Sequence, residues 1–261
     1  MADNSNGMRL QYQSFTDAKM GGPYLNYLRA ALKQAADPGT RIDEVLMSPP
    51  DSYAHSTVET RCGYQAMRNA VHAERAGYDG FLIGHFQDSG LAHAKSLVDI
   101  PVVGLGEISM LHACTMGQRI GLITINPRFI PWHKEQILKY RLENRVVGVH
   151  AMDFAPGDFM AAFETDENYR KVRDAFCEQA MPLIKEGIDV LIPAGGIPML
   201  VLAREPGFNI DGIPVLEGVS LLVKAAETAV KLRRLNGTSI SRTGAFLQPP
   251  KEVIDELLAH P

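Results

Sequence analysis

The sequence has few cysteines and no long apolar run. Cysteine occurs three times in 261 residues, at Cys62, Cys114 and Cys177, which is too few and too scattered for a disulfide framework. No segment approaches the roughly 20 consecutive apolar residues that a membrane span requires. The opening residues MADNSNG are polar and lack the apolar centre of a signal peptide. These absences predict a cytoplasmic protein with no membrane partner, whose residues 1–7 form a disordered tail.

An excess of charge of one sign is lacking as well. The formal net charge is −4 and the isoelectric point is about 6.1, which gives no basic surface for nucleic acid. Neither a P-loop nor a dinucleotide-binding glycine motif with its acidic residue is present, and no cluster has the spacing of metal ligands. We therefore expect no cofactor, no metal and no nucleic-acid partner.

What the sequence does contain is an alternation of apolar, strand-like runs with helical patterns. Strands are predicted at 8–14, 41–48, 79–85, 101–106, 119–125, 146–152, 189–195 and 214–218. The clearest helices are predicted at 23–36, 57–77, 168–187 and 219–234. Most of the strands are apolar throughout, which is typical of strands covered on both faces. The alternation predicts right-handed βαβ units and parallel sheets, hence an α/β fold.

The two halves of the chain resemble each other. RAGYDGFLIGHF at 75–86 corresponds to KEGIDVLIPAGG at 185–196, so that Gly77 pairs with Gly187 and Asp79 with Asp189 at one common offset. MRLQYQSF at 8–15 and RIGLITIN at 119–126 align at the same offset. Several ordered matches at one offset predict two pseudo-symmetric lobes, each a parallel four-stranded sheet flanked by helices. A cleft between two such lobes is a natural ligand site.

The last long helix sets the division into lobes. We expect it to cross back and pack on the first lobe, so that the first lobe comprises 8–115 plus 219–261 and the second comprises 116–218.

His85 lies where an apolar strand stops, in LIGHFQDSGL at 82–91. Ligands collect at the carboxyl ends of parallel strands, so this is a candidate site. The equivalent position of the second half is Gly195, followed by Gly196 and Ile197 at the start of a helix, where free backbone N–H groups favour an anion or a carbonyl. The structural alternatives are that the glycines only permit a tight turn and that His85 only closes its loop.

At these loops the sequence resembles the aspartate/glutamate/hydantoin racemase superfamily, most closely its hydantoin racemase-like branch. HFQDSGL at 85–91 is similar to the family motif Cys-Phe-Gly-Asp-Pro-Gly-Leu. LVDIPVVGLGEISMLHA at 97–113, RIGLITINPRFIPW at 119–132 and SRTGAFLQPPK at 241–251 also look like family segments. The resemblance covers nearly the whole chain and implies the two-lobed fold and a homo-oligomer.

The family racemises with two cysteines, one on each face of the substrate carbon. At the matching positions this sequence has His85 and Gly195. The three cysteines of the chain fall within predicted helices, away from both strand ends, and are expected to be packing residues. The two-thiol reaction is therefore excluded by residue type.

One histidine can still take and return a proton near neutral pH. The resemblance implies a cofactor-independent racemase or isomerase that transfers a proton through His85 at the carbon next to a carboxylate or a cyclic amide carbonyl. The alternatives are a decarboxylase or other single-base carbon–carbon lyase, and a non-catalytic protein that binds a small acid. Whether a second acid or base takes over at Gly195 is left open.

The remaining site candidates surround His85. Thr16 and Thr124 end equivalent strands and are expected to bind the substrate, and Glu107 is expected either to orient His85 or bind the ligand, or to cap a helix. The loop PPDSYAHST at 49–57 is expected to cover the cleft. The full set of predicted substrate-binding residues is Gln13, Ser14, Thr16, Phe86, Gln87, Glu107, Thr124, Gly195, Gly196 and Ile197.

Overall fold

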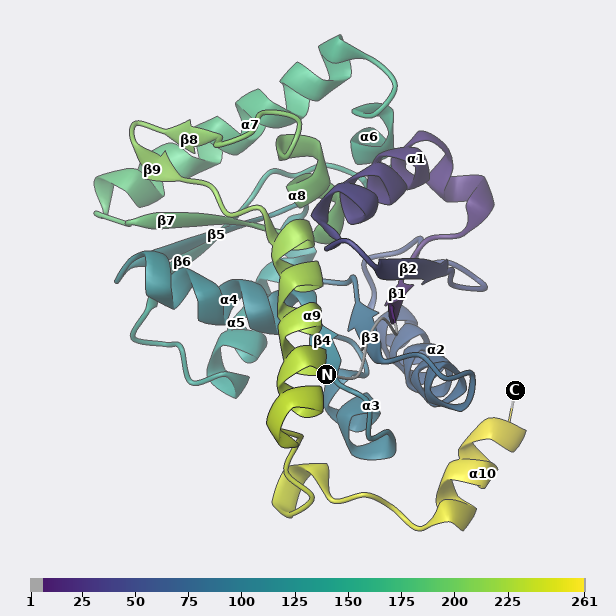
Figure 1. The fold of residues 1–261 in the computed structure, drawn as a ribbon. Helices are drawn as coiled ribbons and strands as arrows, with labels where there is room; N and C mark the ends of the chain where they lie inside the picture. Colours follow the sequence, from purple (N-terminus) through teal and green to yellow (C-terminus); the bar gives the residue numbers. More distant parts are fainter. Residues whose placement is uncertain (1–6, 261) are drawn as a thin grey trace.

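Two parallel sheets form the frame of the protein (Figure 1). The structure, a computed structural model, describes residues 7–260, so the predicted tail at 1–7 lies outside the described residues apart from Gly7. The first sheet has the order β2-β1-β3-β4 and the second the order β6-β5-β7, and every strand pair within them is parallel. The predicted α/β fold with two lobes is confirmed.

The strands begin and end close to the predicted positions. Those of the first sheet are β1 (Met8–Gln13), β2 (Thr40–Val45), β3 (Gly80–Ile83) and β4 (Val102–Gly104), and those of the second are β5 (Ile120–Thr124), β6 (Val146–Ala151) and β7 (Val190–Ala194). The strands β3, β5 and β7 are buried along their whole length, as their continuous apolar sequences predict.

Helices cover both faces of the sheets. They are α1 (Ala18–Ala35), α2 (Ser56–Arg75), α3 (Leu91–Leu97), α4 (Leu105–Met116), α5 (Ile130–Lys139), α6 (Pro156–Ala161), α7 (Asp166–Lys185), α8 (Gly196–Leu202), α9 (Gly218–Asn236) and α10 (Lys251–Ala259), with short 3-10 turns η1 (Pro127–Phe129) and η2 (Gly244–Phe246). No helix within residues 7–260 is both long enough and apolar enough to cross a bilayer.

The repeat predicted from the sequence has the same structural basis in both lobes. Gly77 and Gly187 follow α2 and α7 with φ of +75° and +78°, a conformation that glycine adopts without strain. Two residues later, the carboxylate of Asp79 accepts a hydrogen bond from the backbone N–H of Arg9. The carboxylate of Asp189 accepts one from the N–H of Arg119. Each aspartate thus fixes the start of the strand that pairs with its own.

The second sheet has three strands, not the predicted four. The segment predicted as its last strand instead forms β9 (Ile213–Pro214), which pairs antiparallel with β8 (Asn209–Ile210). Pro214 has no N–H to donate to a sheet. Beyond it, only Val215 forms a parallel bridge, to Leu191 of β7.

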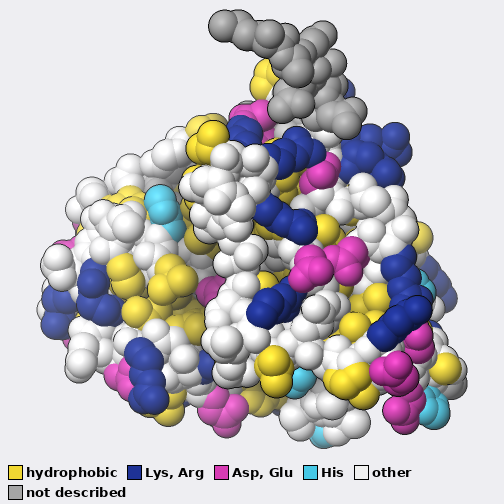
Figure 2. Space-filling view, turned by 60° about the horizontal axis from the view of Figure 1, so that its bottom comes forward, with side chains coloured by type: hydrophobic (Ala, Val, Ile, Leu, Met, Phe, Trp, Pro, Cys, Tyr) yellow, Lys and Arg dark blue, Asp and Glu magenta, His cyan; other side chains and the backbone are white. Residues whose placement is uncertain are grey.

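Helix α9 runs through the middle of the molecule (Figure 1) and packs against α1, α4, β3 and β4. On this basis we propose that residues 219–261 belong with 8–115 and that 116–218 form the second lobe. One core of buried apolar side chains extends through both lobes, and a smaller one lies between β3, α2 and α3. On the face seen in Figure 2, Lys and Arg side chains lie among Asp and Glu side chains.

Candidate functional site

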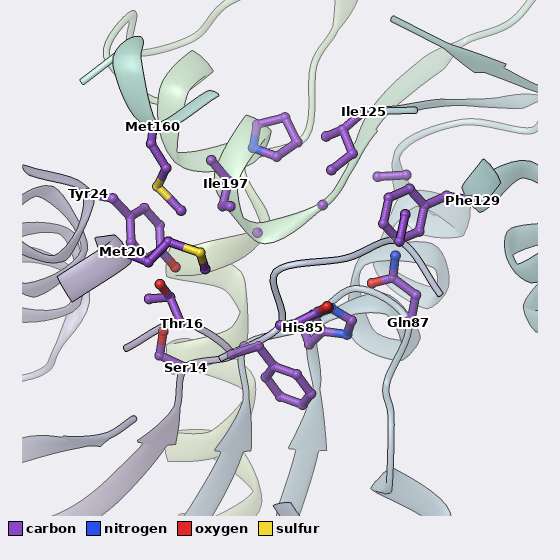
Figure 3. A pocket seen from close by; sticks show the side chains of 18 of the residues that line it. Ser14, Thr16, Met20, Tyr24, His85, Gln87, Ile125, Phe129, Met160 and Ile197 are labelled. Atoms are coloured by element: carbon purple, nitrogen blue, oxygen red, sulfur yellow. The ribbon is translucent and has the colours of Figure 1, made fainter. Parts of the chain in front are cut away.

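A cavity lies between the lobes, at the carboxyl ends of both sheets (Figure 3). The loop after β1, the loop at 49–55 and the loop after β3 line it from the first lobe, and the loops after β5 and β7 line it from the second. The loop at 49–55, predicted to cover the cleft, contributes Asp51, Tyr53 and Ala54 to the lining.

Seven of the predicted site residues line this cavity together: Ser14, Thr16, His85, Gln87, Gly195, Gly196 and Ile197. Figure 3 shows His85 at the end of its strand, below Ile125 and Ile197 of the second lobe, with Ser14 and Thr16 to one side and Gln87 to the other. The cleft therefore contains both the imidazole of the first lobe and the glycine loop of the second.

Four predicted residues lie outside the lining because other groups hold their side chains. Gln13 is fully buried, and its amide donates to the carbonyl of Ser14 at 2.8 Å. Thr124 is also fully buried; its hydroxyl donates to the carbonyl of Ala194 and lies 3.0 Å from Nε2 of His133.

Phe86 and Glu107 complete this group. Phe86 points into the core, edge-on to the ring of His133 at 5.3 Å between centroids. Glu107 lies in the first turn of α4 and forms an ion pair with Lys95, with 2.5 Å between Nζ and Oε2. Neither side chain faces the cavity, although Phe86 is the immediate neighbour of His85.

His85 is held between an aromatic ring and two carboxylates. Its imidazole stacks on Phe15, with 4.2 Å between centroids and 14° between planes. Its Nε2 lies 3.4 Å from Oδ2 of Asp51 and 3.6 Å from Oε1 of Glu59. Nδ1 is buried and has no hydrogen-bond partner among the described residues. One ring nitrogen is thus paired with acids, and the other is buried with its hydrogen-bonding capacity unused.

The carboxylates decide the charge of the imidazole. Burial alone would lower the pKa of His85, but the negative charges of Glu59 and Asp51 outweigh burial and raise it above the ordinary value. Burial alone would raise the pKa of Asp51, but the hydrogen bond and the charge of His85 outweigh burial and lower that pKa. Burial raises the pKa of Glu59, because the charge of His85 compensates only part of it. Asp51 is therefore the stronger acid of the two.

No pattern in the sequence identified Asp51 and Glu59 as partners of His85. Asp51 lies in a loop, and Glu59 in the first turn of α2, where an acidic residue is common for helix stability alone. The packing of α2 beside β3 brings Glu59 to the histidine. The backbone N–H of Asp51 donates to the carbonyl of Phe15, which holds the Asp51 loop beside it. A carboxylate preference at these positions among homologues is the signal that would have identified them.

The glycine loop of the second lobe approaches the histidine loop closely. A Cβ atom at Gly196 would lie 2.8 Å from the carbonyl oxygen of Gly84, the residue before His85, so any larger residue would push the lobes apart. The N–H groups of Gly196 and Ile197 at the start of α8 donate to no backbone acceptor within the described chain. They are free to bind a ligand oxygen.

The lining is polar on one side and apolar on the other. Ser14, Thr16 and Tyr24 contribute hydroxyl groups from the first lobe, and Oγ of Ser14 is buried without a hydrogen-bond partner in the described structure. The second lobe contributes the apolar side, which consists of Ile125, Phe129, Met160, Ala194, Gly195, Gly196, Ile197 and Pro198. None of the lining residues in the described chain is Lys or Arg.

Asp51, Glu59 and His85 are also residue types that bind metals, with one atom from each within 4.8 Å of the others. When the imidazole is protonated, its charge is shared by the two carboxylates, and the cluster then carries one net negative charge. We assign them as an ion-paired group and not as metal ligands. Cys62, Cys114 and Cys177 lie in α2, α4 and α7 as predicted, and none of them lines the cavity.

Comparison with known proteins identifies the family. The model of the Asp/Glu/hydantoin racemase family matches residues 23–226, which is most of the chain. The chain belongs to the Asp/Glu/hydantoin racemase family. As the sequence predicted, it is thus an isomerase of the racemase type.

The relatives of this racemase-family protein agree with that assignment. A hydantoin racemase of Pseudomonas sp. (strain NS671) is 27% identical over 185 residues, which cover 69% of this chain and 68% of the relative. A hydantoin racemase of Paenarthrobacter aurescens is 25% identical, covering 85% of this chain and 90% of the relative. The allantoin racemase from Klebsiella pneumoniae has the same fold, with a TM-score of 0.79, 24% identity and coverage of 94% and 95%.

Proposed function

We propose that this racemase-family protein moves a proton at the carbon next to a carbonyl group and uses His85 as its single proton-transfer residue. The observation that carries this proposal is the asymmetry of the cavity. Tyr24, Asp51, Tyr53 and His85 are the titratable residues of the lining, and all four come from the first lobe. The second lobe contributes no side chain to the lining that exchanges a proton at ordinary pH.

In the proposed reaction the substrate proton moves to Nδ1 of His85, because Nε2 is engaged with Asp51 and Glu59. The two carboxylates stabilise the imidazolium that forms. The free N–H groups of Gly196 and Ile197 bind the substrate carbonyl and stabilise the negative charge that develops on its oxygen. A positioned general base of this kind contributes roughly 10²–10⁴-fold to the rate.

The apolar second face limits how the proton returns. The enolate takes a proton back from His85 on the same face, which restores the original configuration, or from water on the opposite face, which inverts it. Inversion therefore depends on a water molecule entering beside Gly195, and we expect exchange with solvent to be faster than racemisation.

A neutral cyclic amide fits the lining better than a free carboxylate does. The cavity has no Lys or Arg to neutralise a carboxylate, and Asp51 adds a negative charge. Hydroxyl groups and backbone N–H groups suit the carbonyl and N–H groups of a ring amide. The relatives named above are two hydantoin racemases and an allantoin racemase, and both hydantoin and allantoin are cyclic amides.

The test is deuterium uptake from D₂O into 5-benzylhydantoin and allantoin, followed by NMR against buffer alone. We expect uptake with the wild-type protein, and its loss in His85→Ala with ligand affinity retained within a few-fold. Exchange that persists in His85→Ala would contradict the assignment of His85. A test compound that raises the melting temperature without any exchange would indicate a binding protein.

A decarboxylase is the second candidate, because the apolar second-lobe wall favours it. A substrate carboxylate placed against Ile125, Phe129 and Ile197 would lose solvation, and losing CO₂ would relieve that cost. Only one protonation then follows, and one histidine suffices. Release of CO₂ from an aryl-substituted malonate, with no exchange into hydantoins, would favour this function over the first.

A further inference from the structure

A site with one histidine needs a route between that histidine and solvent. The imidazole of His85 is shielded: its side chain is 15% exposed, and Phe15 covers one face of the ring. A substrate in the cleft would cover it further. When His85 takes a proton from the substrate, the imidazolium must therefore lose a proton by another path before it can return to the neutral form.

A second cavity lies behind the histidine. Ser56, Glu59, Gln87 and Ser89 line it from the first lobe, and α5 forms the opposite wall with residues that include Glu135 and Lys139. Ser56, Glu135 and Lys139 are exposed, so this cavity opens to water. Glu59 lines only this cavity, whereas His85 lines only the first. Gln87 lines both cavities, and the contact between His85 and Glu59 lies beside it on the partition between them.

The polar groups across this partition form a continuous chain. Nε2 of His85 lies 3.6 Å from Oε1 of Glu59, and Oε2 of Glu59 accepts a hydrogen bond from the hydroxyl of Ser89. Ser89 itself lines the second cavity. Because Ser89 occupies Oε2, the other carboxylate oxygen stays directed at the imidazole and free to accept its proton.

From this arrangement we infer that Glu59 and Ser89 form a proton path that connects His85 to solvent through the second cavity. The inference deepens the proposed function and rests on it. Substrate enters one cavity, and the proton that discharges the imidazolium leaves from Nε2 through the other. Glu59 carries the proton, and Ser89 is a positioning residue for Glu59.

The proton balance of the path is simple. The substrate C–H proton goes to Nδ1 of His85 while the proton on Nε2 goes to Oε1 of Glu59. The resulting carboxylic acid gives its proton to water in the second cavity and returns to the carboxylate. The imidazole is then neutral and keeps the substrate proton on Nδ1, so the enolate takes its new proton from water on the opposite face. After the product leaves, Nδ1 releases its proton to water in the substrate cavity, and a solvent proton returns to Nε2 through Glu59. No electron changes hands, and water is the only other reactant.

Asp51 does not offer this path although it lies equally close to Nε2. Its side chain faces the substrate cavity and does not line the second one. Its pKa is lowered by His85, whereas burial raises the pKa of Glu59, so Glu59 accepts a proton more readily. Asp51 is therefore a matched control, because its amide variant removes the same charge at the same distance.

The first test needs no substrate. Exchange of the His85 imidazole N–H with water is measured by NMR on protein labelled with ¹⁵N-histidine, with the signal assigned from His85→Gln. Each variant is measured at the same offset from the pH at which its own His85 titrates, so that the change in imidazole charge cancels. We then expect Glu59→Gln to slow this exchange by about tenfold or more, and Asp51→Asn to change it by less than about threefold. Ser56→Trp, which fills the mouth of the second cavity and leaves Glu59 in place, should also slow it. Wild-type exchange in both Glu59→Gln and Ser56→Trp would overturn the path.

The second test uses 5-benzylhydantoin deuterated at C5, in H₂O. With a working path, the wild-type protein washes out nearly all the label at each proton abstraction. In Glu59→Gln the imidazolium should return the deuteron to the substrate more often. The ratio of deuterium lost to abstraction events should therefore be lower than in the wild type, whereas Asp51→Asn should keep the wild-type ratio. An unchanged ratio in Glu59→Gln would overturn the path. If no test compound reacts but N–H exchange still depends on Glu59, the proposed function fails and the path stands.

Discussion

His85 owes its chemistry to residues that are remote in sequence. Phe15 fixes the plane of the ring, and Asp51 and Glu59 set its charge. The position of His85 at a strand end was predictable from the sequence, because a buried apolar run stops there at a glycine. Its partners were not predictable, since a loop aspartate and a first-turn glutamate are ordinary surface features until the fold buries them.

The same limit explains the placement of the two threonines. Thr16 and Thr124 end equivalent strands, and only Thr16 lines the cavity. The hydroxyl of Thr124 is taken by Ala194 and His133, and His133 lies on α5, a helix to which the sequence assigned no role in the site. Repeats predict backbone positions well; they do not predict which neighbour captures a side chain.

The charge of His85 predicts a pH dependence. A base must be neutral to accept a proton, and the carboxylates raise the pKa of His85 above its ordinary value of 6.5. The rising limb of kcat/KM against pH should therefore lie above pH 6.5 in the wild type. Asp51→Asn removes one negative charge, so its limb should move to lower pH. Glu143→Gln, at an exposed position, is the control and should leave the limb unchanged. A limb that does not move in Asp51→Asn would refute this account of the charge.

Chelation tests the assignment of the acidic cluster. Because the proposed reaction moves only protons, we expect dialysis against EDTA to leave turnover intact. Added Zn²⁺ should inhibit, since Asp51, Glu59 and His85 provide three ligand atoms within 4.8 Å of one another. Activity that disappears on dialysis and returns with a divalent cation would mean that the cluster binds a metal instead.

At the scale of elements, Asp88 fastens the histidine loop to two helices. Its carboxylate is 3% exposed and accepts hydrogen bonds from the N–H groups of Gly106 and Glu107 at the start of α4. It also accepts from Gln136 and Tyr140, which belong to the α5 segment of the second lobe. Burial raises the pKa of Asp88 to about 6, and these donors keep it ionised at neutral pH. One carboxylate thus joins the His85 loop to both lobes.

Removal of this carboxylate should be costly. Asp88→Ala leaves four donors without an acceptor, so we expect the free energy of unfolding in urea to fall by about 3–5 kcal/mol. Asp174→Asn, at an exposed position on α7, should change it by less than about 0.5 kcal/mol. A loss of stability for Asp88→Ala no larger than that of the control would show that the contacts are replaced by water.

Asp88 also predicts how stability depends on pH. Its folded pKa of about 6 lies above the ordinary 3.8, so the folded protein holds this proton more tightly than the unfolded chain does. The contribution of this group is complete below pH 3.8 and is lost as the pH rises through about 6. Between these values the slope of stability against pH should be less positive in the wild type than in Asp88→Asn, which has no proton to lose. Parallel slopes in urea titrations of both proteins would contradict the raised pKa.

At the scale of the whole molecule, the chain is two copies of one plan joined by helices. The repeat could be predicted from the sequence because each copy needs the same two residues. A glycine ends a helix, and Asp79 or Asp189 accepts a hydrogen bond from the backbone N–H at the start of the neighbouring strand. The absence of a fourth strand from the second sheet could not be predicted, because the segment expected there pairs locally as β8 with β9. The family resemblance implies a homo-oligomer. This remains a prediction, which a mass measurement by light scattering would test.

The C-terminal segment makes a prediction at this scale. Helix α10 packs Ile254, Leu257 and Leu258 on the smaller core, and Tyr64 of α2 donates to the carbonyl of Leu257. Truncation after Pro250 should lower the free energy of unfolding by about 2–4 kcal/mol, because these partly buried side chains are lost. Val253→Ala, at an exposed position on the same helix, should have little effect on the melting temperature. A truncated protein that melts with the wild type would mean that α10 adds nothing to the core.

The neighbours of Gly195 restrict the size of the side chain that this position can hold. A Cβ atom there would lie 2.9 Å from both Cγ and Cδ of Pro198, a rigid ring in the first turn of α8. Its φ of 170° is extended and open to any residue, so the obstacle is this ring and not the backbone. Restoring a thiol on the second face therefore takes a coordinated change at both positions. With Pro198 in place, no single substitution at Gly195 can add a side chain on this face without moving the first turn of α8.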